Sequence, residues 1–390
     1  MKKIVFIAAI FLIFNGMSYS NNQKSGSTSI VETIDGVEYV HNTDTPLHPN
    51  KNVNFIEELS IGEEDQAGNV VLFNPFLHLV DENENIYISE FEDQVIKVFN
   101  ANGKLMKTIG AKGQGPGEFN SIGYIGVSKE GTLIVHDNYS TRTSWFDSSG
   151  QFLRSIKLPR SVYSFILLKS ASFIICETYR GQDLNERSLD VKEFDFEGKV
   201  IRYYDMNPTH PESLIVRGGS GFNYSGLPVS RGSLFKGDQK REIIYHCVND
   251  KYSIKVFNSS GRPFRIIDRS YEPVPFTNKD AEKYRARYKN HLFKEVEKTV
   301  RSMKMPKVKS VIERMYVDDE SRLWVKTNET KKNGEQTLTA YDIFNPDGYY
   351  YAKIWTDRRP YIFVKGKMYT MIEDPVTGFR TIKRFKVIWN

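Results

Sequence analysis

A short hairpin motif recurs five times along the chain and constrains its fold more than any other feature. Each copy is an apolar strand end, a turn that opens with Asn or Asp, and a glycine. The copies lie at 98–103, 145–150, 194–198, 257–261 and 344–348. The Asn or Asp side chain accepts hydrogen bonds within the turn, and glycine takes the position with positive φ. Five copies of one hairpin predict a repeat protein made of antiparallel strands.

A second recurring unit precedes each hairpin, and it is a polar turn that runs into a strand with apolar residues on both faces. It occurs at 81–88, 128–135, 170–175, 242–245, 318–325 and 365–369. Strands of this kind suit blades that stack face to face around an axis, so we expect these six to be the inner strands. The predicted fold class is all-β, a six-bladed β-propeller of four-stranded antiparallel blades.

The last repeat lacks its hairpin, because only one further strand, at 379–389, follows residues 367–369. Residues 55–62, before the first repeat, resemble residues 103–110 in pattern and in the closing Ile-Gly. We therefore predict that the N-terminal strand at 55–61 pairs beside 379–389. This pairing would complete the last blade and leave the ring without an open end.

Residues 87–119 contain Ile109-Gly110 and the segment Gly-Gln-Gly-Pro-Gly-Glu-Phe at 113–119, and this stretch resembles an NHL repeat. The chain after residue 20 is similar to the bacterial exported family of six-bladed β-propeller proteins. The similarity includes a late helical insertion followed by Arg-Leu-Trp-Val at 322–325. It is strongest in the first two blades. The resemblance implies the fold but little chemistry, since propellers host many functions.

The N-terminus has the layout of a secretory signal. Lys2 and Lys3 precede an apolar run at 4–14, and Ser-Tyr-Ser follows at 18–20. We predict a signal peptide at 1–20, a polar and partly ordered leader at 21–52, and the propeller at 53–390. The protein would then be exported to the periplasm, the cell surface or the medium, with no transmembrane span after signal removal. A retained N-terminal anchor is the alternative.

Composition limits the partners and the chemistry. The net charge of +6 includes the two lysines of the signal, so it is too small to indicate nucleic-acid binding. The chain has 2 cysteines, Cys176 and Cys247, which we expect to be buried packing residues rather than a disulfide. The loop Gly113–Gly117 opens no helix and contains proline, so it is interpreted as a connection between blades rather than a phosphate site.

The spacing of the turn glycines locates two insertions. The intervals are nearly constant up to Gly198 and then lengthen, which places extra residues at 205–231 and 268–307. Longer loops between second and third strands are predicted at 177–189 and 326–338. All four segments belong to one face of a propeller, the usual place for a binding surface in repeat proteins. Neutral drift in loops is the alternative.

The longer insertion predicts one helix near 278–304, with Asn278 as its cap and Pro306 beyond its end. An apolar stripe at spacing four comprises Tyr284, Tyr288, Leu292, Val296 and Val300. The segment also has an excess of basic residues. One interpretation is a basic lid for an anionic partner. The other is an ordinary helix that packs on the propeller by its stripe and exposes a basic face to solvent.

Polar residues predicted on the decorated face are the candidate ligand-binding residues. They are Asp137, Arg142, Tyr179, Arg180, Arg217, Asn223, Arg358 and Arg359. Arginine can hold a carboxylate or phosphate by paired hydrogen bonds, although each of these residues could instead brace a loop. No catalytic residue and no cofactor is predicted. If a metal is bound, the resemblance to NHL-type lyases points to His78, His136 and His246.

The sequence favours an exported binding propeller whose decorated face receives an anionic, glycan-like or protein ligand, for example an envelope protein. One alternative is a lyase or hydrolase of the NHL type, centred on the channel. The other is a non-catalytic scaffold of the cell envelope.

Overall fold

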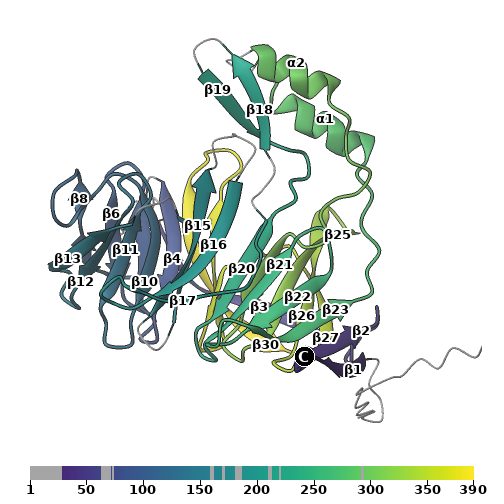
Figure 1. Cartoon of the computed structure of the whole chain (residues 1–390), viewed down its shortest axis with the longest axis horizontal. Helices are drawn as coiled ribbons and strands as arrows, with labels where there is room; N and C mark the ends of the chain where they lie inside the picture. Colours follow the sequence, from purple (N-terminus) through teal and green to yellow (C-terminus); the bar gives the residue numbers. More distant parts are fainter. Residues whose placement is uncertain are drawn as a thin grey trace, which may run out of the picture.

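Six four-stranded antiparallel sheets arranged in a ring make up most of the computed structural model, so the predicted fold class is confirmed (Figure 1). The structure describes residues 29–62, 72, 74–158, 162–168, 172–180, 187–209, 213–218, 221–290 and 294–390. The predicted signal peptide lies outside these residues. Among the helices described, none is long and apolar enough to cross a membrane.

The blades are numbered in chain order, and the strands of each blade are given from the innermost to the outermost. The outermost strand of blade 6 comes from the N-terminal part of the chain. Blades 1 to 3 consist of β4 (Pro75–Val80), β5 (Ile86–Glu90), β6 (Val95–Phe99), β7 (Leu105–Ile109); β10 (Ile122–Val127), β11 (Leu133–Asp137), β12 (Arg142–Phe146), β13 (Phe152–Lys157); and β14 (Val162–Leu167), β15 (Phe173–Arg180), β16 (Arg187–Phe194), β17 (Val200–Tyr203). Blades 4 to 6 consist of β20 (Ser233–Asp238), β21 (Ile243–Val248), β22 (Ser253–Phe257), β23 (Pro263–Arg269); β24 (Arg314–Val317), β25 (Leu323–Asn333), β26 (Gln336–Phe344), β27 (Tyr350–Thr356); and β28 (Ile362–Val364), β29 (Lys367–Glu373), β30 (Arg380–Trp389), β3 (Val53–Ile61).

The innermost strands β4, β10, β14, β20, β24 and β28 each contact the next, and β28 contacts β4, which closes the ring. The strands expected to be inner are instead the second strands of the blades. Their position explains their composition: they lie between neighbouring blades on both sides, so that all five residues of β5 are buried. The innermost strands border the channel and therefore include polar residues.

The predicted closure of the ring is confirmed. Strand β3 pairs antiparallel with β30, with Val53 opposite Trp389 and Ile61 opposite Ile382. The first propeller strand in the sequence is thus the outermost strand of the last blade. This pairing joins the two ends of the repeat array by backbone hydrogen bonds.

A hairpin before β3 was not expected from the sequence. Strands β1 (Ser29–Ile34) and β2 (Val37–Asn42) are joined by Asp35 and Gly36, which both have positive φ. This Asp-Gly turn between alternating residues is a strong hairpin signal that could have revealed it. β2 adds parallel to β23, which makes blade 4 part of a six-stranded sheet.

The chain then follows the outside of blade 5 before it enters blade 6. The backbone N–H groups of Leu47 and His48 donate to the carbonyl oxygens of Tyr350 and Tyr351, each at 2.9 Å. We call residues 29–52 the N-terminal belt, because they contact three successive blades. In Figure 1 the hairpin of the belt lies at the lower right, away from the helices.

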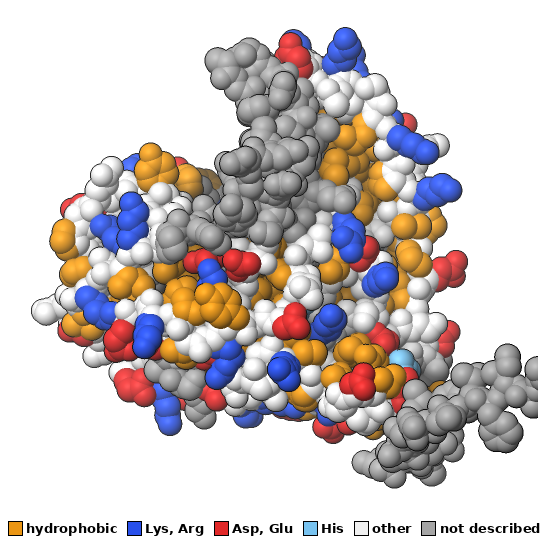
Figure 2. Space-filling view, in the orientation of Figure 1, with side chains coloured by type: hydrophobic (Ala, Val, Ile, Leu, Met, Phe, Trp, Pro, Cys, Tyr) orange, Lys and Arg blue, Asp and Glu red, His pale blue; other side chains and the backbone are white. Residues whose placement is uncertain are grey.

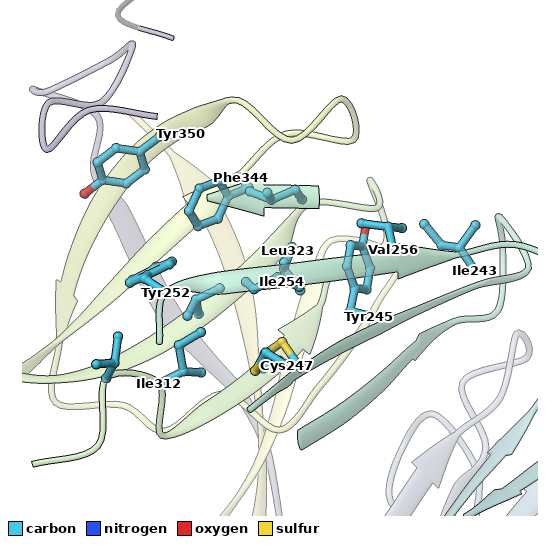
Figure 3. Packing of buried hydrophobic residues seen from close by; sticks show 14 residues of the cluster. Ile243, Tyr245, Cys247, Tyr252, Ile254, Val256, Ile312, Leu323, Phe344 and Tyr350 are labelled. Carbon is cyan, nitrogen blue, oxygen red and sulfur yellow. The ribbon is translucent and has the colours of Figure 1, made fainter. Parts of the chain in front are cut away.

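The core is divided among the interfaces between blades. At the interface of blades 4 and 5, Tyr245, Ile254 and Leu323 pack with Phe344 and Tyr350 (Figure 3). Cys247 belongs to the same cluster, and both it and Cys176 are buried and free, as predicted. Because every blade buries both faces, the apolar second strands follow directly from this architecture.

The two insertions lie side by side and form one projection above the ring (Figure 1). The first contains the hairpin β18 (Ser213–Gly218) and β19 (Gly221–Gly226). The second contains α1 (Asn278–Ala286) and α2 (Lys294–Ser302), and α2 contacts β18. In the segments predicted as loops at 177–189 and 326–338, the described residues are largely strand, since β15, β16, β25 and β26 extend into them.

The helical insertion is present, but it consists of two helices rather than one. Thr277, not Asn278, is the N-cap: its hydroxyl accepts from the backbone of Asp280, whose carboxylate accepts from the backbone of Thr277. After α1, Asn290 has a positive φ of 63°, which a continuous helix does not allow. Tyr284, Val296 and Val300 form a small cluster of their own, so the stripe joins the two helices to each other. Leu292 lies outside the described residues.

Candidate functional site

The mouth of the central channel lies on the face that carries the projection. The chain passes on this face from the outermost strand of one blade to the innermost strand of the next. The first residues of the innermost strands, and the connections before them, therefore surround the mouth. Those of blades 5, 6 and 1 bring together arginine and aromatic side chains.

Two exposed arginines lie at this mouth, near enough to each other that their charges act on the same two tyrosines. Arg314 is the first residue of β24, and Arg359 lies in the connection between β27 and β28. The carboxylates nearest in sequence are taken by other groups: Glu313 pairs with Lys326 at 2.7 Å, and Asp357 with Arg358 at 3.7 Å. Within the described part of the chain, neither Arg314 nor Arg359 forms an ion pair.

The two guanidinium groups act on Tyr316, which is buried, and on Tyr361, which is partly buried. Burial raises the pKa of Tyr361 to about 12, against the opposing charges of Arg314 and Arg359. Burial raises the pKa of Tyr316 too, against the charges of Arg314 and Arg359 and against a close contact of its hydroxyl with the Arg359 side chain. The Tyr316 side chain is buried, so a ligand at the mouth meets the two guanidinium groups rather than the Tyr316 hydroxyl.

The walls of the mouth are aromatic and tied together across blades. The Phe76 ring meets Tyr361 edge-on, with 5.9 Å between ring centroids. The Tyr124 hydroxyl donates to the carbonyl of Tyr163 at 2.6 Å, and the Tyr163 hydroxyl donates to the carbonyl of Ser233 at 3.0 Å. These bonds join the innermost strands of blades 2, 3 and 4 and fix the geometry of the mouth.

The arrangement can hold an anion. Two guanidinium groups match a carboxylate, sulfate or phosphate, and arginine binds such groups by paired hydrogen bonds. Sequence reasoning named Arg359 but missed Arg314 and Tyr316. A strand-by-strand alignment of the innermost positions would have placed Arg314 at the start of β24, although not beside Arg359.

Two of the predicted ligand-binding residues hold loops in blade 2. The Asp137 carboxylate accepts from the backbone N–H groups of Asn120, Tyr139 and Ser140, at 2.6, 2.8 and 2.9 Å. The Arg142 guanidinium donates to the carbonyls of Gln114 and Glu118. Both side chains are therefore used by the fold, and a ligand role for them stays a prediction.

The glycine-rich connection that Arg142 holds is filled by the protein itself. It lies between β8 (Ala111–Lys112) and β9 (Glu118–Phe119), which pair in parallel. The Glu118 carboxylate accepts from the backbone of Gly115 at 2.8 Å, and a Cβ on Gly113 would meet that carboxylate at 2.1 Å. A carboxylate of the same chain thus occupies the place where an anion would approach the loop.

The other predicted residues lie in separate parts of the decorated face. The Arg358 guanidinium stacks on the Phe385 ring, 4.9 Å from its centroid. Tyr179 and Arg180 are in β15, and Arg217 and Asn223 are in β18 and β19, on adjacent rungs of one hairpin. The side chains of these four residues lie outside the description. Among the eight residues, the described side chains of Asp137, Arg142 and Arg358 contact other parts of the protein, and a site shared by all eight stays a prediction.

The three histidines named for a possible metal each bond a hydroxyl of their own blade. His78 bonds Ser89 at 2.8 Å, His136 bonds Thr143 at 3.0 Å, and His246 bonds Ser233 at 2.9 Å. Burial lowers the pKa of His78 to about 3 and those of His136 and His246 to about 4. Across the described residues, no three His, Cys, Asp or Glu side chains gather as a metal site requires.

Two shallow hollows lie away from the mouth. One, of about 380 Å³, is lined by Asp190, Tyr203 and Tyr204 of blade 3. The other, of about 650 Å³, lies against α2 beside Lys294, Lys298 and Arg301. Glu297 pairs with both Lys294 and Arg301. Figure 2 shows Lys and Arg side chains spread along the outer side of the projection rather than gathered in one patch. The solvated basic face therefore describes this helix pair better than a basic lid.

Comparison with known sequences identifies a family without a described activity. Residues 68–302 match the family described as domain of unknown function DUF4934. No curated protein sequence matches the chain.

Comparison with solved structures finds distant matches. A "putative exported protein" from Bacteroides fragilis is 13% identical, covers 90% of this chain and 99% of its own, and has a TM-score of 0.49. A DUF4221 family member from Bacteroides vulgatus is 13% identical over 87% of this chain and 98% of its own, also at 0.49. Virginiamycin B lyase from Staphylococcus aureus is 11% identical over 86% and 100%, at 0.45. These similarities transfer no activity to this chain.

Proposed function

Because the chain belongs to the DUF4934 family, a domain of unknown function, we propose from its own residues that it is a binding propeller for an anionic ligand. The ligand enters at the mouth of the channel, on the face that carries the projection. Its carboxylate, sulfate or phosphate group is held by Arg314 and Arg359. The same face is predicted from the sequence to receive an anionic, glycan-like or protein ligand, and the arginine pair favours an acidic small molecule or sugar.

The observation that carries this proposal is the pair of exposed arginines, Arg314 and Arg359, whose charges both act on Tyr316 and Tyr361. Two like charges side by side repel each other and stay poised for an anion. Hydrogen bonds between arginine and a carboxylate are stronger than neutral ones, and they select planar anions. The rigid tyrosine links of the mouth reduce the entropy that is lost on binding.

We also propose that the protein acts outside the cytoplasm, on the basis of the predicted signal peptide at 1–20. Mass spectrometry of the protein from its native host checks this. A mature N-terminus near residue 21 in an extracytoplasmic fraction is expected, and an intact Met1 in the cytoplasm would contradict it.

Binding is tested by calorimetry with galacturonate, trigalacturonate, inorganic phosphate and sulfate. We expect at least one of these anions to bind, with an affinity that falls as salt is raised. The double variant R314A/R359A should lose about tenfold or more in affinity, because each arginine contributes a charge-assisted bond. Comparison of the affinities for the four anions shows whether the site prefers a carboxylate, a phosphate or a sulfate group.

The matched control is Arg262→Ala. Arg262 is an exposed arginine in the turn between β22 and β23, on the opposite face of the ring. The Arg262→Ala substitution removes one positive charge, as each of the two substitutions at the mouth does, but it should leave the affinity for the anion unchanged. The proposal fails if none of the four anions binds, or if R314A/R359A binds as tightly as the Arg262→Ala control.

A further inference from the structure

Exposed aromatic side chains occur on the decorated face in each of blades 6, 1 and 2, on the other side of the ring from the projection. Phe91 is 62% exposed and Tyr139 78%, and Phe76 and Phe379 are 41% and 38% exposed. We call these four residues the aromatic arc. Phe91, Tyr139 and Phe379 lie between the second and third strands of their blades, and Phe76 is on the innermost strand β4. Large exposed apolar side chains grouped on one face indicate an interaction site.

Hydrogen bonds fix the backbone that carries the arc. The N–H of Phe91 donates to the carbonyl of Asn74 at 3.3 Å, and the Arg380 guanidinium, next to Phe379, donates to the Asn74 side chain at 3.1 Å. Buried Gln94 donates to the carbonyl of Phe91 at 2.6 Å and accepts from the N–H of Ile122 at 2.8 Å. Asp137 holds the loop of Tyr139. Blades 6, 1 and 2 therefore present these rings from one connected framework.

The arc is continuous with the arginine pair. Phe76 packs edge-on against Tyr361, and the charges of Arg314 and Arg359 act on Tyr361. A ligand held at the arginines can thus extend over Phe76 and onward to Phe91 and Tyr139. The projection stands over the opposite side of the ring, so this direction leaves the mouth away from it (Figure 1).

The surroundings of the arc favour a sugar chain over a protein. Exposed polar residues, Glu92, Asp93 and Thr377, lie between the aromatic positions. A protein partner of high affinity needs a contiguous apolar centre that becomes fully buried. A pyranose ring instead offers a small apolar C–H face edged by hydroxyl groups. Separate aromatic rings with carboxylate and hydroxyl acceptors between them match that alternation.

We propose that the aromatic arc binds the extended part of an acidic oligosaccharide whose anionic group lies on Arg314 and Arg359. This inference rests on the proposed function and names the class of its ligand. Successive sugar units stack on Phe76, Phe91 and Tyr139, so affinity should rise with chain length. The ligand therefore needs an acidic group for the arginines and several sugar units for the aromatic arc.

The test measures calorimetric affinity for glucose oligomers of two, three and six units that each carry one terminal carboxylate (cellobionate, cellotrionate and cellohexaonate), with neutral cellohexaose as a reference. In the wild type we expect cellohexaonate to bind about tenfold more tightly than cellobionate. F91A/Y139A should remove this gain and leave cellobionate binding unchanged, because aromatic stacking is worth about tenfold. R314A/R359A should weaken all three. Tyr203→Ala, an exposed tyrosine on the outer strand of blade 3, is the matched control.

The two proposals fail separately. If affinity does not rise with length, or if F91A/Y139A keeps the gain, the arc does not bind the chain while the arginine site stands. If R314A/R359A has no effect on any acid, the proposed function fails. Equal binding of cellohexaose and cellohexaonate would overturn the acidic character of the ligand.

Discussion

The two halves of the ring are built from the same repeat but are held together differently. Blades 4, 5 and 6 are joined on the outside by the N-terminal belt, which contacts each of them in turn. Blades 1, 2 and 3 are joined through the contacts of their own faces, as where Trp145, Phe173 and Phe194 pack between blades 2 and 3. The reinforced half is the one in which the chain closes on itself.

Buried polar groups show the same difference. At the interface of blades 4 and 5, Asp342 pairs with Arg269 at 2.8 Å and accepts from the hydroxyls of Tyr252 and Tyr350, each at 2.8 Å. Arg269 is almost fully buried. In blade 3, Glu193 also lies on the third strand and bonds Arg202 and Tyr204, but the Arg202 side chain is 33% exposed. Equivalent strands of two blades thus carry ion pairs whose loss should lower the free energy of unfolding by very different amounts.

The largest expected effect is that of Asp342→Ala. Removal of the carboxylate leaves Arg269 buried without a counter-charge, which costs about 3–5 kcal/mol of unfolding free energy. Glu193→Ala should cost clearly less, because Arg202 can turn to solvent. Urea unfolding of both variants measures the difference. Equal losses would show that the two halves do not differ in this respect.

Acidification is expected to weaken blade 2 through His136. Its pKa in the fold is about 4, against 6.5 for an unperturbed histidine, because burial disfavours the charged form. Between pH 6.5 and 4 the unfolded state therefore binds the proton first, so stability is complete above pH 6.5 and falls as the pH drops towards 4. Each pKa unit corresponds to about 1.4 kcal/mol. His136→Gln should flatten the dependence of unfolding free energy on pH over this range, and an unchanged slope would contradict the assignment.

Asn42→Ala tests the belt itself. The Asn42 amide donates to the carbonyls of Asp268 and Gly348, at 3.1 and 3.0 Å, and accepts from the N–H of Tyr350 at 2.8 Å. Its removal leaves buried groups unsatisfied, so we expect a loss of about 1–3 kcal/mol in urea unfolding. The control is Asn100→Ala in a hairpin turn of blade 1, whose side chain bonds only exposed N–H groups. A larger loss for Asn100→Ala would place the reinforcement in the repeat rather than the belt.

The smallest effect is expected for Thr277→Ala. Loss of this N-cap costs about 1 kcal/mol, confined to α1 in the projection. Hydrogen exchange should quicken in 278–286 while the urea midpoint of the ring stays unchanged. A shift of the midpoint would show that the projection is part of the cooperative unit of the ring.

The ring could be predicted from the sequence because each blade repeats the same local signals. The Ile-Gly at 61–62 matched that at 109–110, and this single match located the closing strand. The belt was missed because its partners, such as Asp268 and Tyr350, are more than two hundred residues away and leave no local pattern. The arginine pair was half found for a similar reason. Arg314 and Arg359 come from different blades, and only the ring places them together.

The closing strand also sets an order in time. Val53 has its partner Trp389 at the far end of the chain, and Asn42 bonds Tyr350. Neither contact can form until almost the whole polypeptide has been synthesised. The first segments to leave the ribosome must therefore wait without their native partners, and contacts this distant in sequence make folding slow. We expect the chain to remain unfolded, and therefore able to be transported in an extended form, until β30 has been synthesised.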